Sequence, residues 1–286
     1  MRQRRGLLAR LARLARVLAL FALTLVAILI SALVFFPFER LAPALAGWIE
    51  AETRIATSIG ALDAGFSARG PTLEAHDIQF RWPTGEQLAL GSLRVSPALS
   101  LAWLRGVPTL RVAGSAEFGA FEGVVSAERI EGDFMRFDFA ALPPAWFGGA
   151  GSPLAGPVAA KVAFARLAEQ WTGSAQIEGE DGSLALPGSP VAIPYEALKA
   201  NLRLDEVGTL HVESVALRGP MVEAQAHGEV AAGYKGPATG AIAIEADLTR
   251  TDPALLPTLA AFGVQLDARG AGHLSISGTP EQIVIR

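Results

Sequence analysis

The hydrophobic and polar positions follow two different patterns along the chain. Residues 17–36 form a run of twenty residues without a charge. A helix of that length spans about 30 Å, the hydrocarbon thickness of a bilayer. From about residue 62 onward, apolar and polar residues alternate instead, which is typical of β-strands with one apolar and one polar face. The patterns therefore predict a transmembrane helix over residues 17–36 and a mainly β region after it.

The charges around the apolar run predict its orientation. Six arginines precede it, and the first acidic residue of the chain is Glu39. By the positive-inside rule, residues 1–16 form a cytoplasmic basic segment and the bulk of the chain lies across the membrane. We expect a single-pass protein of a bacterial inner membrane, with its main part in the periplasm. The alternative is a cleaved signal peptide, but the apolar core of such a peptide has only about 7–15 residues.

Residues 37–60 are predicted to form a juxtamembrane amphipathic helix. Leu41, Leu45, Trp48 and Ile49 fall near helical spacing. Gly60 is a stop signal of the kind that often ends a helix. This helix would cover the start of the β region that follows.

The alternating segments predict an antiparallel meander over residues 61–286, because Gly-containing turns separate them. Two architectures satisfy the alternation. The apolar faces can pack together in a barrel or sandwich, or they can line an open groove in a long curved sheet. The inward positions are often Ala, Val and Gly, which favours the groove, whereas composition favours the packed core. The predicted strands cover residues 74–82, 87–96, 109–113, 116–122, 124–131, 158–164, 195–205, 222–230, 242–248, 274–276 and 283–285.

Two segments interrupt the strands and indicate a possible duplication. Residues 138–156 are rich in Pro and Gly, and residues 252–263 predict a short helix with Asp252 as N-cap and Pro253 in its first turn. Each segment follows a strand that carries an acid next to an apolar residue, and each leads through a glycine into a new strand. A two-fold internal repeat with a break near residues 140–157 would account for this order, and the sequence leaves it open.

The composition narrows the function classes. An apolar share of 51% excludes a disordered chain. With no cysteine, the chain can form neither a disulfide scaffold nor a thiolate metal site. Outside the arginine cluster, 28 acidic residues outnumber the remaining 18 basic ones. Nucleic acid is therefore not an expected partner, since phosphate binding requires a basic surface.

The sequence offers no convincing catalytic, cofactor-binding or metal-binding residues. The strongest candidates are the pairs His211 with Glu213 and His227 with Glu229, which place a His and a Glu on one strand face. The polar outer face of an amphipathic strand explains both pairs more simply. The chain also contains no H-E-x-x-H or G-x-S-x-G motif. We therefore predict that the protein is not an enzyme and has no cofactor.

Several stretches past the apolar run follow one another in a characteristic order. They are FPFERL at residues 36–41, LEAHDIQF at 73–80, the turn PTG at 83–85, LAL at 88–90, LAWLRG at 101–106, the meander around residues 119–125 and GTP at 278–280. This order resembles that of type II secretion system protein N and, more broadly, of AsmA-like proteins. The resemblance is most specific at the first two stretches and covers most of the chain as architecture.

The resemblance implies a long curved antiparallel sheet that folds into an AsmA-like groove. For protein N it implies an accessory role in type II protein secretion, with other secretion-system subunits of the inner membrane or periplasm as partners. For the broader family it implies lipid handling or transfer along an apolar groove, with phospholipid as the ligand. The families supply no catalytic motif, so no site residue is carried over to this chain.

Overall fold

The computed structural model describes Thr24 and residues 38–67, 70–98, 106–144, 152–167, 170–185, 192–233, 240–261, 263–279 and 282–285. The predicted cytoplasmic segment 1–16 and the predicted transmembrane segment 17–36 lie outside these residues, apart from Thr24. Within the described part of the chain, no helix is both long enough and apolar enough to cross a bilayer.

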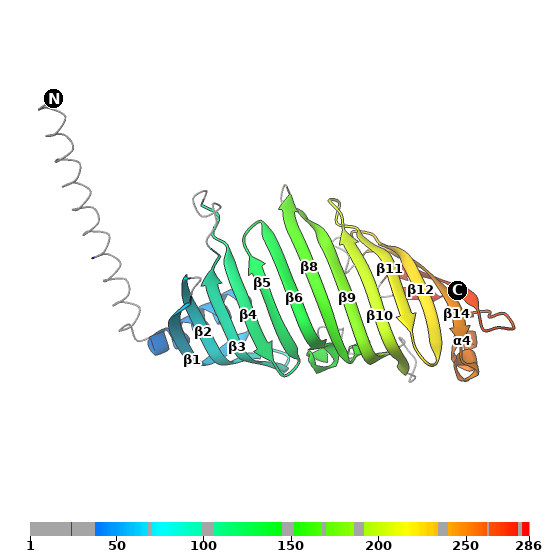
Figure 1. The fold of residues 1–286 in the computed structure, drawn as a ribbon, viewed down its shortest axis with the longest axis horizontal. Coiled ribbons are helices and arrows are strands. Elements are labelled where there is room, and N and C mark those ends of the chain that lie inside the picture. The colour runs from blue at the N-terminus through cyan, green and yellow to red at the C-terminus, as the bar shows by residue number, and fades with distance from the viewer. Residues whose placement is uncertain are drawn as a thin grey trace, which may run out of the picture.

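The described strands form one large antiparallel sheet in which neighbours in sequence are also neighbours in space (Figure 1). A packed pair of sheets is therefore not the architecture of this part of the chain. β7 (Leu154–Ala155) pairs with β9 beside the main path. Along that path the strands are β1 (Ala56–Ser67), β2 (Gly70–Arg81), β3 (Gln87–Pro97), β4 (Leu110–Ala116), β5 (Gly119–Val125), β6 (Arg129–Asp138), β8 (Pro157–Leu167), β9 (Gln170–Ala185), β10 (Ala192–Leu204), β11 (Leu210–Arg218), β12 (Val222–Val230), β14 (Ile242–Thr251), β15 (Gly272–Thr279) and β16 (Gln282–Ile285).

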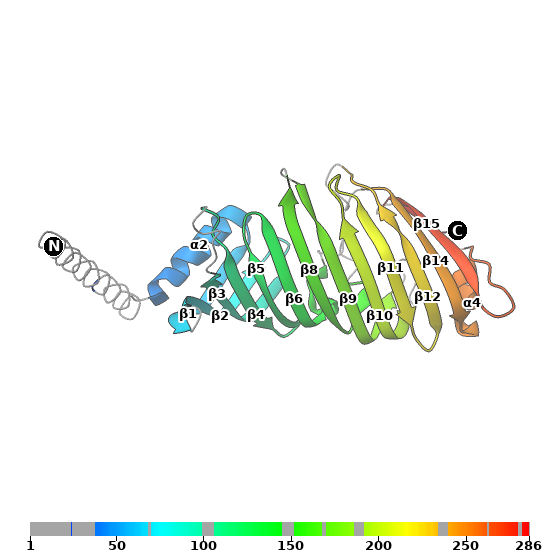
Figure 2. The same cartoon turned by 45° about the horizontal axis from the view of Figure 1, so that its top comes forward.

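The predicted juxtamembrane helix is shorter than expected. A 3₁₀ turn, η1 (Phe38–Arg40), leads into α2 (Leu41–Thr53), and β1 begins at Ala56. The prediction that the helix continues to Gly60 was wrong, because Arg54 takes a left-handed conformation and closes the helix with a bond from its N–H to the Glu50 carbonyl. Figure 2 shows α2 beside the first strands, where it covers one end of the sheet.

The strand predictions were confirmed for many of the strands and wrong at two turns, and they did not include β1, β9 or β11. Residues 222–230 form β12 with the expected bounds. The segments 116–122 and 124–131 each cross a hairpin, because the turns lie at residues 117–118 and 126–128. Both turns are short and carry alternating apolar and polar residues, so the period of two continues through them and hides the reversal of the chain.

Three strands reverse their alternation at a residue in the left-handed region. Asp77 in β2, Arg136 in β6 and Asp181 in β9 have φ values of 53°, 51° and 48°. Asp77 and Arg136 lie across from Gly60 and Gly119 of the neighbouring strand, and Asp181 with Gly182 lies against Gly156, which stands between β7 and β8. A Cβ on these glycines would lie 2.7–2.9 Å from backbone or Cβ atoms across the strand pair. The reversals act as β-bulges and keep apolar residues on the same face beyond each kink.

The ends of the strands form two long borders of the sheet, and the two borders differ in their connections. One border, which we call the closed edge, carries the connections β2–β3, β4–β5, β6–β8, β9–β10, β11–β12 and β14–β15. Short helices there pack onto the apolar face: η2 (Phe139–Ala141), η4 (Pro253–Leu255) and α4 (Leu256–Ala261). The opposite edge, which we call the open edge, carries the remaining hairpins. Its described connections contain no buried Leu, Ile, Val or Phe.

The core consists of two separate clusters at the two ends of the sheet. One joins α2 to β1–β3 through Ala42, Leu62, Ile78 and Leu90 and includes Phe118. The other packs Leu255, Leu259 and Val264 against β10–β15. The predicted helix over residues 252–263 is confirmed as η4 and α4. The Asp252 carboxylate accepts a 2.8 Å hydrogen bond from the Ala254 N–H, as expected of an N-cap.

Candidate binding surface

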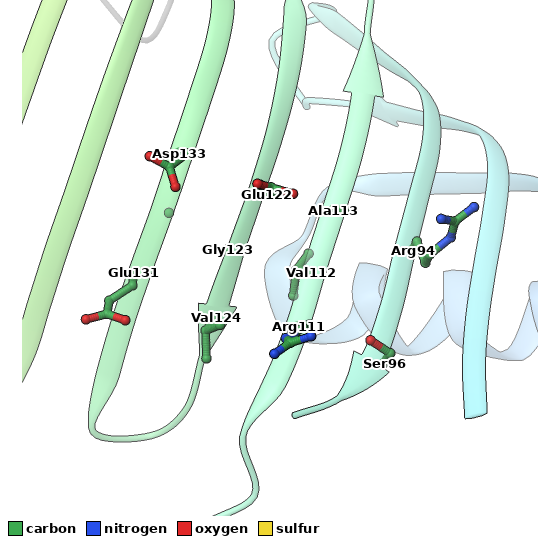
Figure 3. Close-up of a pocket in the computed structure, with 11 residues that line it drawn as sticks. Arg94, Ser96, Arg111, Val112, Ala113, Glu122, Gly123, Val124, Glu131 and Asp133 are labelled. Atoms are coloured by element: carbon green, nitrogen blue, oxygen red, sulfur yellow. The ribbon is translucent and has the colours of Figure 1, made fainter. Parts of the chain in front are cut away.

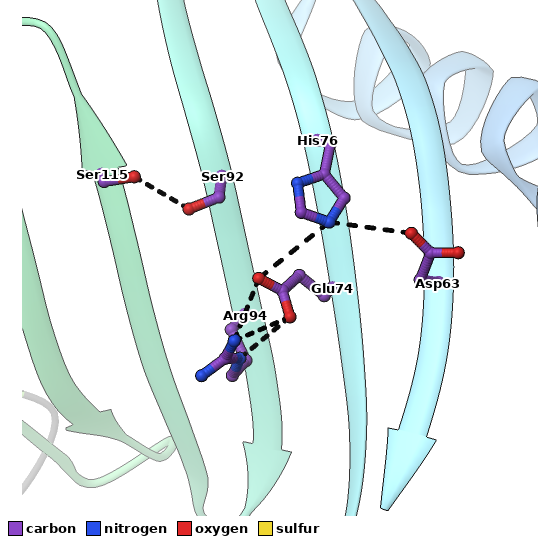
Figure 4. Close-up of polar contacts among 6 residues, drawn as sticks. All are labelled: Asp63, Glu74, His76, Ser92, Arg94 and Ser115. Carbon is purple, nitrogen blue, oxygen red and sulfur yellow. Dashed lines mark hydrogen bonds and ion pairs between the residues drawn. The ribbon is translucent and has the colours of Figure 1, made fainter.

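The outward face of the sheet is polar and carries all four histidines. Figure 4 shows the network around His76, whose Nε2 lies 3.7 Å from Asp63 and 4.0 Å from Glu74. Glu74 also accepts hydrogen bonds of 2.9–3.1 Å from Arg94. Further along this face, His227 pairs with Glu245 at 3.5 Å and His273 with Asp247 at 2.8 Å. These contacts join neighbouring strands and indicate a solvated, charge-paired surface.

His211 makes the most extensive of these contacts. Its Nε2 lies 2.8 Å from Asp205, and its Nδ1 lies 3.8 Å from Glu229 on the next strand. The hydrogen bond with His211 lowers the pKa of the Asp205 carboxyl group, and bonds from the N–H groups of Thr209 and Val207 act in the same direction. Asp205 thus ties the β10–β11 turn to the polar face.

The two His–Glu pairs singled out in the sequence do not meet as pairs. Glu213 binds Arg203 at 2.8 Å, and Glu229 lies beside His211 rather than His227. Cross-strand neighbours are closer than residues two apart on one strand, so each acid pairs sideways. No group of three or more His, Asp or Glu residues in the described chain is arranged to hold a metal ion.

The polar face also has a broad hollow over β3–β6 (Figure 3). It measures about 470 Å³, and its charged lining consists of Arg94, Arg111, Glu122, Glu131 and Asp133. None of these side chains is buried. Acid–base or nucleophilic chemistry depends on groups whose pKa values are tuned by desolvation. The charged side chains of this hollow are open to solvent, so the hollow provides little desolvation.

The opposite face is apolar in uninterrupted rows that run across the strands. Residues in register on neighbouring strands form each row, and three rows cross ten strands from β4 to β15. At about 4.8 Å per strand, a row extends over roughly 45 Å. Row A, nearest the open edge, contains Leu110, Val125, Ile130, Phe164, Gly173, Leu204, Leu210, Val230, Ile242 and Gly278.

Two further rows lie parallel to row A on the same face. No member of either row has a polar side chain. Row B consists of Val112, Gly123, Gly132, Val162, Ala175, Leu202, Val212, Gly228, Ile244 and Ile276. Row C consists of Gly114, Phe121, Phe134, Ala160, Ile177, Ala200, Val215, Ala226, Ala246 and Leu274.

A fourth row, row D, borders the closed edge from β6 to β15. It contains Phe137, Val158, Gly179, Leu198, Leu217, Ala224, Leu248 and Gly272. Like the other three rows, it has no polar side chain.

Burial increases steadily from row A to row D. In row A, Leu110, Val125 and Ile130 are 37–39% exposed. Rows B and C are mostly half-buried, and Phe121, Phe134 and Ile177 are examples. In row D, Val158 is 1% exposed. The apolar face is therefore packed at the closed edge and accessible toward the open edge, where it can receive an apolar partner.

The alternation in the sequence predicted that each strand has an apolar and a polar face. It did not predict the continuous apolar rows that cross ten strands. The rows exist only because the cross-strand register aligns apolar positions from ten strands. No local motif encodes that register, since each hairpin contributes only one pair to each row. The small residues expected at inward positions are present, and Gly123 and Gly132 lie side by side in row B.

Comparisons of the chain with protein-family models, with curated proteins and with solved structures found no match.

Proposed function

We propose that this chain is a non-enzymatic accessory component of a type II protein secretion system, anchored in the inner membrane with its sheet in the periplasm. The observation that carries the proposal is the two-faced, open-edged sheet, which offers large surfaces for contact and, among the residues that the structure describes, no enclosed polar cleft. The assignment to type II secretion rests on the resemblance of residues 36–131 to protein N.

The anchoring follows from the sequence that precedes the fold. Residues 17–36 are uncharged and long enough to span a bilayer, and the arginines before them favour a cytoplasmic N-terminus. The first described element of the fold, η1, begins at Phe38. In this arrangement α2 and β1 lie next to the membrane, and the sheet extends away from the anchor toward partner subunits.

Deletion of the gene in its native host, combined with co-purification, tests this proposal. We expect loss of export of the folded cargo proteins, with restoration by the full chain. The full chain should also co-purify with other inner-membrane or periplasmic subunits of the secretion system. As a control, a chain in which residues 17–36 are replaced by an unrelated transmembrane helix should retain function if that segment serves only as an anchor. Normal export and intact assembly without the protein would contradict the proposal.

A second function, AsmA-like lipid handling, is favoured by the accessibility of rows A–C. Half-buried apolar side chains such as Phe121, Phe164 and Leu202 lie in these rows, and transfer of each CH₂ group of a lipid from water to an apolar surface contributes about 0.8 kcal/mol. In this alternative the curved sheet forms a groove along which phospholipid is held or moved.

Lipid extraction from the purified full chain tests the second function. We expect phospholipid in the extract and its loss in Leu202→Glu, because the substitution places a charge in row B. The matched control is Gln176→Glu, which adds the same side chain to the polar face of neighbouring β9. Circular dichroism of both variants verifies the fold. Equal lipid content in the two variants would reject the apolar face as the lipid-binding surface.

A further inference from the structure

Exposed apolar side chains gather at the open edge of the sheet. Of the ten large hydrophobic residues that are most exposed in the described chain, six lie in strand ends or turns at this edge. The other four are spread over α2, the polar face, α4 and β16. The six are Phe66 (58%), Leu110 (39%), Val125 (38%), Ile130 (37%), Leu167 (54%) and Val207 (70%).

The exposure at the open edge is not a general property of strand ends. In the described connections of the closed edge, Phe118 is 6% exposed, Leu142 7% and Leu255 1%, whereas Leu256 on α4 is 42% exposed. The same strands therefore end in a packed border on one side and in an unpacked apolar border on the other. An exposed apolar border of this extent is expected where a partner or a membrane surface covers it.

The polar residues of the open edge have the chemistry of a membrane interface. Exposed Arg111 and Arg129 lie at the polar-face side of this border, next in sequence to Leu110 and Ile130, and Arg129 is paired with Glu131. Exposed Arg166 lies on the apolar side, with Trp171 directly across from it in register. Trp and Arg are characteristic of the headgroup region, where their apolar parts are buried and their polar ends stay hydrated. Each basic residue near an anionic bilayer contributes about 1 kcal/mol. The acids Glu128 and Glu206 also lie in these turns and reduce the net positive charge.

We propose that the open edge lies on the surface of the phospholipid bilayer, with Leu167, Val207 and the exposed members of row A inserted among the headgroups. The proposal rests on the membrane anchoring proposed above. Because only Pro37 lies between the predicted anchor and the first element of the fold, the edge is held at high local concentration near the bilayer. Weak apolar contacts are then sufficient for docking. Rows A–C then open toward the membrane, and row D faces away from it.

The absence of cysteine makes the chain suited to site-specific labelling. Single-cysteine variants of the full chain at Val125, Leu167 and Val207 carry an environment-sensitive fluorophore after reconstitution into phosphatidylethanolamine and phosphatidylglycerol vesicles. Quenching is measured with a phospholipid that bears a nitroxide near its headgroup. The matched controls are Leu256→Cys on α4 at the closed edge and Met135→Cys on the polar face, which are 42% and 47% exposed.

We expect strong quenching at the three open-edge positions and little at the two controls. Equal quenching at all five positions, or none at the open edge, would overturn the proposal. Protection of the open-edge labels from both lipid and aqueous quenchers would instead indicate that a protein covers this border, and it would also overturn the proposal.

The outcome can be separated from the lipid-handling function. Val207 lies in a turn and not in rows A–C, so lipid carried along the apolar face would leave its label unquenched. Quenching of row A alone, without Val207 and Leu167, would therefore reject bilayer docking while remaining compatible with a lipid-binding face. If Leu202→Glu loses bound lipid but the label at Val207 is still quenched, bilayer docking occurs independently of lipid binding by the apolar face.

Discussion

The two long edges of the sheet are made by the same strands and yet have opposite properties. At the closed edge, connections such as the one between β14 and β15 fold back over row D and bury it. At the open edge, only residues 126–128 separate β5 from β6, and the row A members Val125 and Ile130 beside this turn stay partly exposed. The difference shows how one amphipathic sheet can provide both a stable core and an accessible apolar surface.

The largest test of this comparison is the loss of a buried side chain at the closed edge. Leu255→Ala removes a residue that is 1% exposed and packs in the C-terminal cluster. We expect it to lower the free energy of unfolding by about 3 kcal/mol, because it loses apolar burial and leaves a cavity. Leu167→Ala at the open edge should change stability by less than about 0.5 kcal/mol. Urea denaturation of the full chain in detergent measures both, and equal effects would contradict the distinction between the edges.

Glycines at the two edges provide a second test. Gly156 has a φ of +103°, and a Cβ there would lie 2.7 Å from the Cα of Gly182. Gly156→Ala should lower the unfolding free energy by about 2 kcal/mol, from backbone strain and the clash together. Gly70 at the open edge has a φ of +114° but only Pro97 at 3.8 Å. Gly70→Ala should cost only the strain, about 1 kcal/mol. A larger thermal shift for Gly70→Ala would show that the kinks at the closed edge are not tightly packed.

The helix cap at the closed edge provides a smaller test. Asp252→Ala removes the acceptor for the Ala254 N–H and should lower stability by about 1 kcal/mol. Asp252→Asn keeps an oxygen acceptor at the same position and serves as the control. The denaturation midpoint of Asp252→Ala should be lower than that of Asp252→Asn. Indistinguishable midpoints would show that Pro253 and the packing of Leu255 hold this turn without the cap.

The loss of stability at alkaline pH is expected to depend on Tyr195, which lies at the closed edge. Burial raises the pKa of the Tyr195 phenol, and the negative charge of Asp138 adds to the effect. The unfolded phenol ionises near pH 10, so the contribution of Tyr195 is complete below that pH and lost as the pH rises through the folded pKa. Tyr195→Phe should reduce the loss of stability between neutral and strongly alkaline pH. An unchanged pH profile would show that other groups govern this limit.

The smallest effect on stability is expected from Asp205, at the open edge, when the pH is lowered. The folded pKa of Asp205 is lowered, so its contribution is present above its unfolded pKa of about 3.9 and lost as the pH falls through the folded value. Asp205→Asn should flatten the acid limb of the stability profile slightly, because the carboxylate is exposed and screened by solvent. A steeper acid limb in this variant would reverse the expected sign.

The two halves of the possible internal repeat share a structural feature at the closed edge. Asp138 and Asp252 each cap a 3₁₀ turn at the closed edge, and each is followed by a glycine of positive φ, Gly156 and Gly270, before the next strand. In the strand before residues 252–263, the acid that stands next to an apolar residue in the sequence is Asp247, beside Leu248. Asp247 instead pairs with His273 on the polar face, which makes Asp252 the better match.

The sequence by itself determined the class of the fold and the polarity of its faces. Alternation over 222–230 or 195–205 requires a two-sided strand, and Asp252 followed by Pro253 requires a helix start, because both depend on interactions within a few residues. The end of α2 at Thr53 and the turns at residues 117–118 and 126–128 were missed, since local spacing fits more than one boundary there.

Only the tertiary structure decided which edge of the apolar face is closed and which is open. Val158 and Val162 lie four residues apart on β8 with the same side chain, yet the first is buried in row D and the second is half-buried in row B. Their difference comes from the register of ten strands and from short helices that fold back at one edge. Those long-range contacts depend on how the whole sheet assembles, and no segment of the sequence contains them.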